Sequence, residues 1–402
     1  KNILQFSAVV STFLQSMRDS HTFFNLRDVL FLYSRRKSVV PFYIKEFDTK
    51  FYLSKIWKNH IPVGAEILKV GSFAIDSLYK LAQVYTPYEA NTLSARKELN
   101  EVIMGNVFNL YHKEISKKIT FEFVDKSGDT VVKKINALSF RKLSKEKNWY
   151  PSKDIEYNFY KNKAYLRIHS FEPKNELRFI KKINRFFQSV EGRSDVSVYI
   201  DIRDNKGGYI LLLEHLLSHI NSGGGTFDLR YQYKRSELDR FETLSRLKKM
   251  DFIKKAQRVY PKGMISKEYD FYRSPMGTEK SILYKKDLKN RTQSVYKGNC
   301  TLVTNGLSMS ASVLMASWFK EKNRGQLIGT PCFGSQSGTS GNPASIFLDN
   351  SGLPVSISTL ILRPNNSKKD QINDMKMDLE IIISLKDIRS GTDPFEEKLF
   401  RD

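Results

Sequence analysis

The chain has 402 residues, 40% of them hydrophobic, and 66 Lys and Arg against 43 Asp and Glu give it a formal net charge of +23. This length predicts two or three domains, and the apolar content is sufficient for a buried core, which excludes an intrinsically disordered chain. The sequence contains no run of about 18 apolar residues, so it predicts no helix that crosses a bilayer.

The start of the chain and its cysteines bear on where the protein works. Lys1 follows no methionine and no charged-then-apolar leader, so we expect that a targeting segment has been removed or trimmed, as in a cell-envelope, periplasmic or secreted protein. Cys300 and Cys332 are too few for a disulfide framework and lack the spacing of metal ligands. We expect both to be buried small apolar side chains, with a single disulfide bridge as the alternative.

Residues 1–37 are predicted to form an N-terminal helical segment. Apolar side chains recur at helical spacing over residues 3–17 and again over residues 26–33, which is the pattern of a helical hairpin. The polar break at Asp19–His21 places the imidazole of His21 at a helix end, where it can point into a cleft.

Residues 38–140 change to short strand-like runs separated by turns. Lys126–Asp129 has the composition of a hairpin turn. The pattern predicts strands at residues 39–47, 51–56, 65–70, 118–124 and 130–135 and a helix at residues 75–84.

Residues 141–402 open with a lysine-rich linker and then alternate strands with helices, which predicts an α/β domain with a largely parallel sheet. Ligands bind such sheets at the carboxyl ends of the strands. The predicted strands are residues 164–168, 196–202, 301–304, 326–328, 355–362 and 379–384, and the predicted helices are residues 174–187, 210–220 and 311–320.

A basic insertion at residues 229–297 interrupts this alternation and carries about half of the excess positive charge. Its basic residues alternate with acidic ones on a helix-like stretch over residues 236–258, and it has no RNA-binding or metal-finger motif. We therefore expect a solvated surface and no nucleic-acid partner, with electrostatic docking on an anionic surface as a weaker alternative.

A serine-bearing turn between a predicted strand and a predicted helix is the first candidate for chemistry. Ser310 lies between residues 301–304 and residues 311–320, so its hydroxyl would be held rigidly beside the unpaired amide groups of a helix N-terminus. Such amides stabilise an oxyanion, which makes Ser310 a candidate nucleophile. A serine that only caps the helix or packs against the sheet is the alternative.

A second loop, Asp201–Gly208, follows a predicted buried strand and ends in two glycines. Paired glycines allow positive φ, so the N–H groups of Gly207 and Gly208 can face a substrate carbonyl. A plain strand-to-helix turn with a structural ion pair between Arg203 and Asp204 explains the same residues equally well.

A nucleophilic serine needs a base within hydrogen-bond reach. His169 ends a predicted strand at the same sheet edge, whereas His21 is distant in sequence but has a polar neighbour in Ser20, and periodicity does not choose between them. His215 and His219 are one helical turn apart, but without a third ligand nearby we expect packing rather than a metal site. The sequence predicts neither a metal nor a cofactor.

Four ordered motifs and the closing segment of the chain are informative together. They are Tyr165–Phe171, Tyr199–Gly208, Ser308–Ser312, Ile328–Gly334 and Gly391–Leu399. This set resembles the tail-specific, or C-terminal-processing, serine peptidases and their tricorn relatives. The resemblance implies a crotonase-like α/β catalytic domain over residues 141–402 and an inserted PDZ-like, carboxylate-binding domain over residues 38–140.

The resemblance also implies a branch of that family. The C-terminal-processing branch has a catalytic lysine just after the Phe-Gly turn, where this chain has Ser335. The tricorn-like branch instead uses a Ser-His pair, which Ser20 and His21 match, and this makes His21 the favoured base. The late acid of that branch falls near Asp370, which would supply charge, and Gln371, which would orient an imidazole without it.

As a whole, the resemblance implies a serine endopeptidase that acts on extended or unfolded polypeptides through an acyl-enzyme on Ser310, with His21 as the base. N–H groups of Gly207 or Gly208 and of Ala311 would hold the oxyanion, and the PDZ-like domain would grip the C-terminus of the substrate. The alternative, motivated by the departures from the family pattern, is a peptidase-like protein that binds a peptide or apolar ligand without cleaving it.

Overall fold

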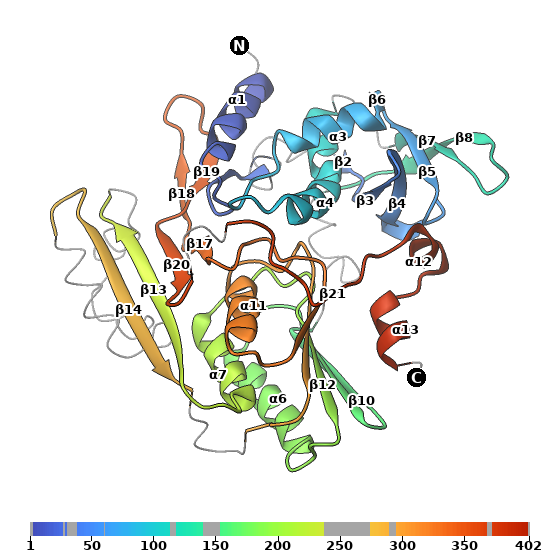
Figure 1. Ribbon diagram of the computed structural model, residues 1–402. Coiled ribbons are helices and arrows are strands. Elements are labelled where there is room, and N and C mark those ends of the chain that lie inside the picture. The colour runs from blue at the N-terminus through green and yellow to red at the C-terminus, as the bar shows by residue number, and fades with distance from the viewer. Residues whose placement is uncertain are drawn as a thin grey trace.

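Parallel strands joined by helices form the central sheet, as the alternation in the sequence predicts (Figure 1). The computed structural model describes residues 3–26, 29, 38–59, 61–112, 118–139, 153–236, 274–288, 295–367 and 372–400. In the central sheet β10 is antiparallel at one edge and the remaining strands are parallel. In spatial order the strands are β10 (Ile155–Tyr160), β11 (Lys163–Ile168), β12 (Ser197–Asp201), β15 (Cys300–Thr304), β16 (Gln326–Gly329) and β21 (Leu379–Glu380).

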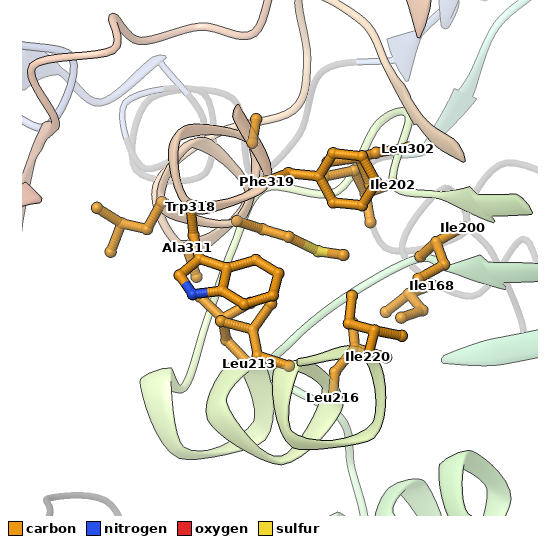
Figure 2. Packing of buried hydrophobic residues seen from close by; sticks show 14 of the residues in the cluster. Ile168, Ile200, Ile202, Leu213, Leu216, Ile220, Leu302, Ala311, Trp318 and Phe319 are labelled. Atoms are coloured by element: carbon orange, nitrogen blue, oxygen red, sulfur yellow. The ribbon is translucent and has the colours of Figure 1, made fainter. Parts of the chain in front are cut away.

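The largest apolar core lies between this sheet and three helices (Figure 2). Ile200 and Leu302, on adjacent strands, belong to it together with Leu213 and Phe319 from two of the helices. Because successive strand residues point to opposite faces, Val303 instead packs in a smaller cluster on the other face of the sheet. The helices are α6 (Glu176–Ser189), α7 (Ile210–Ile220) and α11 (Ala311–Glu321), and all three were predicted.

An antiparallel sheet, a separate pair of short strands and two helices make up most of residues 38–139. The strand predicted at residues 39–47 is split into β2 and β3, which lie in different sheets, and the other strands predicted there are confirmed apart from small differences at their ends. Pairing of β2 with β9 brings the two ends of this segment together. The elements are β2 (Ser38–Val39), β3 (Phe42–Phe47), β4 (Lys50–Ile56), a 3₁₀ turn (Trp57–Asn59), β5 (Glu66–Val70), β6 (Phe73–Ala74), α3 (Ile75–Gln83), α4 (Leu93–Tyr111), β7 (Lys118–Val124), β8 (Thr130–Asn136) and β9 (Leu138–Ser139).

The sequence pattern does not predict helix α4. One side of the helix packs on β3, where the ring centroids of Phe108 and Phe42 are 5.9 Å apart. Another side reaches the central domain, where Glu98 Oε2 accepts a hydrogen bond of 3.1 Å from the N–H of Gly306. A helix that is buried on several sides carries no single apolar stripe, so its period is hidden in the sequence.

The first residues form helix α1 (Ile3–Gln15), as predicted, but a strand rather than a helix comes next. That strand, β1 (Phe23–Phe24), pairs with β19 (Pro354–Ile357), which also pairs with β18 (Ala344–Phe347). Residues 23 and 24 lie between the two predicted helices, so β1 is an element that the sequence pattern does not predict. In the second predicted helix, residues 26–33, the two described residues, Leu26 and Val29, are helical, and the others lie outside the described residues.

Described parts of the basic insertion belong to a four-stranded sheet. In it β14 (Glu279–Asp287) and β20 (Leu360–Pro364) pair with β13 (Thr226–Lys234), and β17 (Thr339–Gly341) pairs with β20. The helix-like stretch predicted at residues 236–258 lies outside the described residues, apart from its first residue.

The late strands differ from the prediction. Residues 355–362 form two strands, β19 and β20, in different sheets. Ser358 lies between them, and its N–H donates a hydrogen bond of 3.1 Å to Thr22 Oγ1, which takes the chain out of the strand. The strand predicted at residues 379–384 ends at Glu380, and helix α12 (Leu385–Ser390), which Ser384 caps, begins after it.

Arg203 ties the last helix, α13 (Pro394–Phe400), to the end of β12. Its Nη2 lies 2.7 Å from an oxygen of Asp201 and 2.7 Å from an oxygen of Asp393. The guanidinium also lies 4.0 Å from the ring centre of Phe395. The ion pair expected between Arg203 and the next residue is therefore wrong, because the guanidinium turns inward toward the two other carboxylates.

Two expectations from composition hold within the part of the chain that the structure describes. No helix there combines the length and the apolar character that crossing a bilayer requires. Cys300 and Cys332 are free and buried, and burial raises the pKa of the Cys300 thiol to about 11. Both side chains therefore act as small apolar groups, and the alternative of a disulfide bridge is wrong.

Gly105 is expected to be essential to the contact between α4 and β3. A Cβ there would lie 2.6 Å from the carbonyl oxygen of Phe42. Alanine is the better helix former by about 1 kcal/mol, but overpacking costs about 1–3 kcal/mol, so Gly105→Ala should destabilise the protein in urea unfolding. Gly223→Ala is the control, because a Cβ at Gly223 meets nothing within 4 Å. A Gly105→Ala variant as stable as this control would contradict the prediction.

Candidate active site

Ser310 lies in a strained turn between β15 and α11. Its backbone has φ 55° and ψ −116°, a left-handed conformation that residues with side chains rarely adopt. Ser310 is the N-cap residue of α11 and partly exposed, yet its hydroxyl makes no capping hydrogen bond. The alternative that this serine only caps the helix is therefore wrong.

The neighbouring serines hold the turn in place. Ser308 Oγ donates a hydrogen bond of 2.8 Å to the carbonyl of Ile202, and Ser312 Oγ donates one of 2.9 Å to the carbonyl of Asn205. The N–H of Met309 also donates to the carbonyl of Asn205, at 2.9 Å. Three hydrogen bonds therefore lock the serine turn onto the loop that follows β12.

The two glycines of that loop have different roles. Gly207 has φ 91°, and a Cβ there would lie 2.6 Å from Cβ of Ser310 and 2.8 Å from the amide nitrogen of Ala311. Its N–H, however, donates a hydrogen bond of 2.8 Å to Asn205 Oδ1. Gly207 thus provides space beside the serine, and the interpretation of its N–H as an oxyanion donor is wrong because that donor is already used.

Two other amides remain as oxyanion donors. Ala311 is the first residue of α11, and its N–H has no carbonyl one turn earlier in the helix to pair with. Gly208 has φ 136° and pairs with Phe171 through a bridge in which neighbouring groups make the hydrogen bonds. Among the described residues, neither the N–H of Gly208 nor that of Ala311 has an acceptor.

His21 lies in the loop that follows α1 and is held there by Asp19. The N–H of His21 donates to Asp19 Oδ1 at 2.9 Å, and Thr22 Oγ1 donates to Asp19 Oδ2 at 2.8 Å. On the imidazole, Nδ1 lies 3.1 Å from Ser20 Oγ and 3.0 Å from Ser340 Oγ. Both contacts involve the same ring nitrogen.

A buried carboxylate, Glu89, lies behind these serines. Its Oε2 accepts hydrogen bonds from the N–H of Ser20 at 2.9 Å and from Ser340 Oγ at 3.1 Å. Its Oε1 accepts one from the N–H of Ser340 at 3.3 Å. Glu89 lies just before α4, and nothing in the sequence pattern singles it out.

The protonation of this cluster follows from its burial. Loss of water lowers the pKa of His21 below its usual value, against the opposing effect of Asp19. Burial also raises the pKa of Glu89 to about 7, although hydrogen bonds from Ser20 and Ser340 act the other way. The imidazole is therefore neutral at neutral pH, as a general base must be.

The segment Phe333–Ser340 contacts both parts of the site. Phe333 pairs with Met309, beside the serine turn, and Ser340 reaches the imidazole of His21. The Ser-His motif near the start of the chain and the serine turn near its end are thus joined through one short stretch.

Asp19, His21 and Glu89 each place a potential metal-ligating atom within 4.8 Å of the others. Their carboxylate oxygens, however, already accept hydrogen bonds from backbone N–H and hydroxyl groups. This geometry fits a hydrogen-bonded network better than a metal centre.

Three of the other histidines have structural contacts. His169 Nε2 lies 3.5 Å from Glu156 Oε1 on the neighbouring strand. His215 and His219 share Asn184, with Nε2 to Oδ1 distances of 2.7 and 3.0 Å. Burial lowers the pKa of His219 to about 3, so this pair packs as neutral rings, as expected.

The structure does not describe the two residues that the family resemblance implies for the acid. Asp370 and Gln371 both lie outside the described residues. Ser335, at the position of the lysine in the other branch, is buried, and its Oγ lies 2.7 Å from Ser337 Oγ.

A strained serine on the turn from a parallel strand to the following helix is typical of serine hydrolases. The model of peptidase family S41 matches residues 162–379, more than half of the chain, so the protein belongs to peptidase family S41. The protein is accordingly a serine-type peptidase with the mixed α/β fold of that family.

Solved structures share this fold over nearly the whole chain. A crystal structure of a CPAF mutant has 14% identity and a TM-score of 0.65, and the match covers 97% of this chain and 85% of that one. Mature CPAF complexed with lactacystin has 15% identity and a TM-score of 0.60, with 98% and 87% covered. At this level of identity the likeness concerns the fold alone. A search of curated proteins gave no match.

The backbone strain at Ser310 should be measurable as a difference in the free energy of unfolding between two variants. Ser310→Gly should be more stable than Ser310→Ala by about 1–2 kcal/mol in urea unfolding, because glycine adopts a φ of 55° without a Cβ clash. Ser317, in the middle of α11, is the control site, where glycine should instead be about 1 kcal/mol worse than alanine. Equal stability of the two Ser310 variants would show that the turn is unstrained.

Proposed function

We propose that the protein is a serine endopeptidase in which Ser310 is the nucleophile and His21 the general base. The single observation that carries this proposal is the conformation of Ser310: a strained, partly exposed serine whose hydroxyl caps no helix and which lies against Gly207 and Ala311. Such strain persists only where the surrounding structure enforces it, and it is common at active sites.

The proposed mechanism assigns one step to each of these groups. Ser310 Oγ attacks the scissile carbonyl carbon while His21 takes the hydroxyl proton, and the carbonyl oxygen becomes an oxyanion held by the N–H groups of Gly208 and Ala311. His21 then gives the proton to the leaving amine, which leaves an acyl-enzyme. Water, deprotonated by the same imidazole, releases the acid and restores Ser310. Loss of one oxyanion donor would slow the reaction roughly a hundredfold or more.

We further propose a crotonase-like catalytic domain and a PDZ-like domain over residues 38–140 that takes the C-terminus of an extended substrate. The antiparallel sheet with α3 packed on β5 and β6 supports the second assignment, and strand addition is the recognition mode that such a sheet offers.

A fluorophosphonate probe tests the nucleophile. The wild-type protein should be labelled on Ser310 and should cleave an unstructured casein-type substrate, and Ser310→Ala should lose both activities. Ser317→Ala is the matched control, a serine of α11 whose hydroxyl has no partner among the described residues. Absence of labelling in folded wild-type protein would overturn the proposal and favour a peptidase-like protein that binds peptides without cleaving them.

Recognition of the substrate C-terminus is tested by chemistry on the peptide. A peptide with a free terminal carboxylate should have a several-fold lower KM than the same peptide with a terminal amide, because only the carboxylate can bind as an anion. Equal KM values for the two peptides would remove this role from residues 38–140.

A further inference from the structure

We propose that Glu89, acting through Ser340, is the carboxylate that positions His21 and stabilises its charged form. This inference rests on the proposed function and deepens it. The assignment departs from the expected position of the acid, since Glu89 lies before α4 rather than after the serine turn. Glu89 touches neither substrate nor the reacting atoms, so its role is that of a positioning residue.

The direction of the hydrogen bonds carries the inference. Ser340 has one hydroxyl proton, and a carboxylate only accepts, so Ser340 Oγ donates to Glu89 Oε2 across 3.1 Å. The same Oγ must then accept from His21 Nδ1, which lies 3.0 Å away. Nδ1 therefore carries the imidazole proton, and Nε2 keeps the lone pair that a general base needs. The chain Glu89–Ser340–His21 selects the productive tautomer.

Glu89 and Ser340 are both held in place by further hydrogen bonds. The N–H of Ser340 donates to Glu89 Oε1 at 3.3 Å, so one carboxylate binds the backbone and the hydroxyl of the same serine. Ser340 is also held in β17, opposite Ile361 of β20. The main-chain oxygen of Glu89 accepts hydrogen bonds from the N–H and the hydroxyl of Thr92 at the start of α4. A rigid support of this kind keeps an imidazole within the narrow range of angles that proton transfer requires.

Ser20 also contacts both Glu89 and the imidazole of His21. Its N–H donates to Glu89 Oε2 at 2.9 Å, and its Oγ lies 3.1 Å from His21 Nδ1. Ser20 and Ser340 thus each contact both the ring nitrogen and the same carboxylate.

Asp19 is the other charged group beside His21, and it has a different task. Its Oδ1 accepts from the backbone N–H of His21, and its Oδ2 accepts from the hydroxyls of Thr22 and Ser358. These bonds shape the loop and do not involve the imidazole ring. Among the described residues, Glu89 is the carboxylate whose hydrogen bonds lead to Nδ1.

The charge of Glu89 matters when His21 becomes an imidazolium. A buried anion two hydrogen bonds away favours the positive ring, because the surroundings contain little water to screen it. Burial of Glu89 raises its pKa to about 7, so its ionised fraction increases with pH across the neutral range. Asp19 contributes a second negative charge nearby, which also favours the protonated ring.

Steady-state kinetics of Glu89→Gln test the proposal. The isosteric amide removes the charge, so kcat should fall about a hundredfold or more with little change in KM, and the acid limb of the kcat/KM profile should move to lower pH. Ser340→Ala should give a similar loss, and the double variant should be no worse than the single ones, because both substitutions break one chain. Glu101→Gln is the control, a buried carboxyl on α4 that accepts from the N–H of Glu46 and should keep wild-type kinetics.

The outcomes separate this inference from the proposed function. If wild-type protein is neither labelled by the fluorophosphonate nor active, the proposed function fails and the inference fails with it. If wild-type protein is active but folded Glu89→Gln keeps its kcat and its acid limb, only the positioning role is overturned. Should Glu89→Gln not fold, as judged by circular dichroism, Ser340→Ala decides the matter by the same two readouts.

Discussion

The close contact between Gly207 and the Ser310 turn is the constraint on which the rest of the site depends. Ser310 adopts a backbone conformation that is unfavourable for any residue with a Cβ, and the hydrogen bonds of Ser308 and Ser312 to the neighbouring loop hold it there. A side chain at Gly207 would collide with Cβ of Ser310. The hydroxyl is therefore presented at the N-terminus of α11, beside amides with no internal partner, because the surrounding loops leave the turn no relaxed alternative.

Helix α4 connects this turn to the imidazole. Glu89 precedes the helix and binds the serines around His21, whereas Glu98, inside the helix, accepts from the N–H of Gly306 next to the serine turn. The same helix packs its other side on the antiparallel sheet of residues 38–139. Both groups of contacts therefore depend on the position of α4, which packs on that sheet.

Local sequence patterns predicted many of the strands and helices correctly. In the central domain β11, β12, β15 and β16 and the helices α6, α7 and α11 follow directly from apolar runs and helical periods, and the Ser310 turn follows from the junction of β15 and α11. Strands β13 and β14, at the basic insertion, were not predicted. The failures share one physical origin in tertiary contact. Helix α4 lacks an apolar stripe because it is buried on several sides, β1 forms because Phe23–Phe24 finds a strand near the far end of the chain, and the N–H of Gly207 is used by Asn205.

The sequence by itself determined the fold class, the family and the identity of the serine and histidine motifs, since each of these is written in short stretches of neighbouring residues. Only the tertiary structure decided which carboxylate is hydrogen-bonded to the serines that contact His21. Glu89 and Ser340 are ordinary polar residues, and 251 positions of sequence separate them. Their significance arises from hydrogen bonds that no local pattern encodes, because burial and the direction of a hydrogen bond are properties of the folded chain.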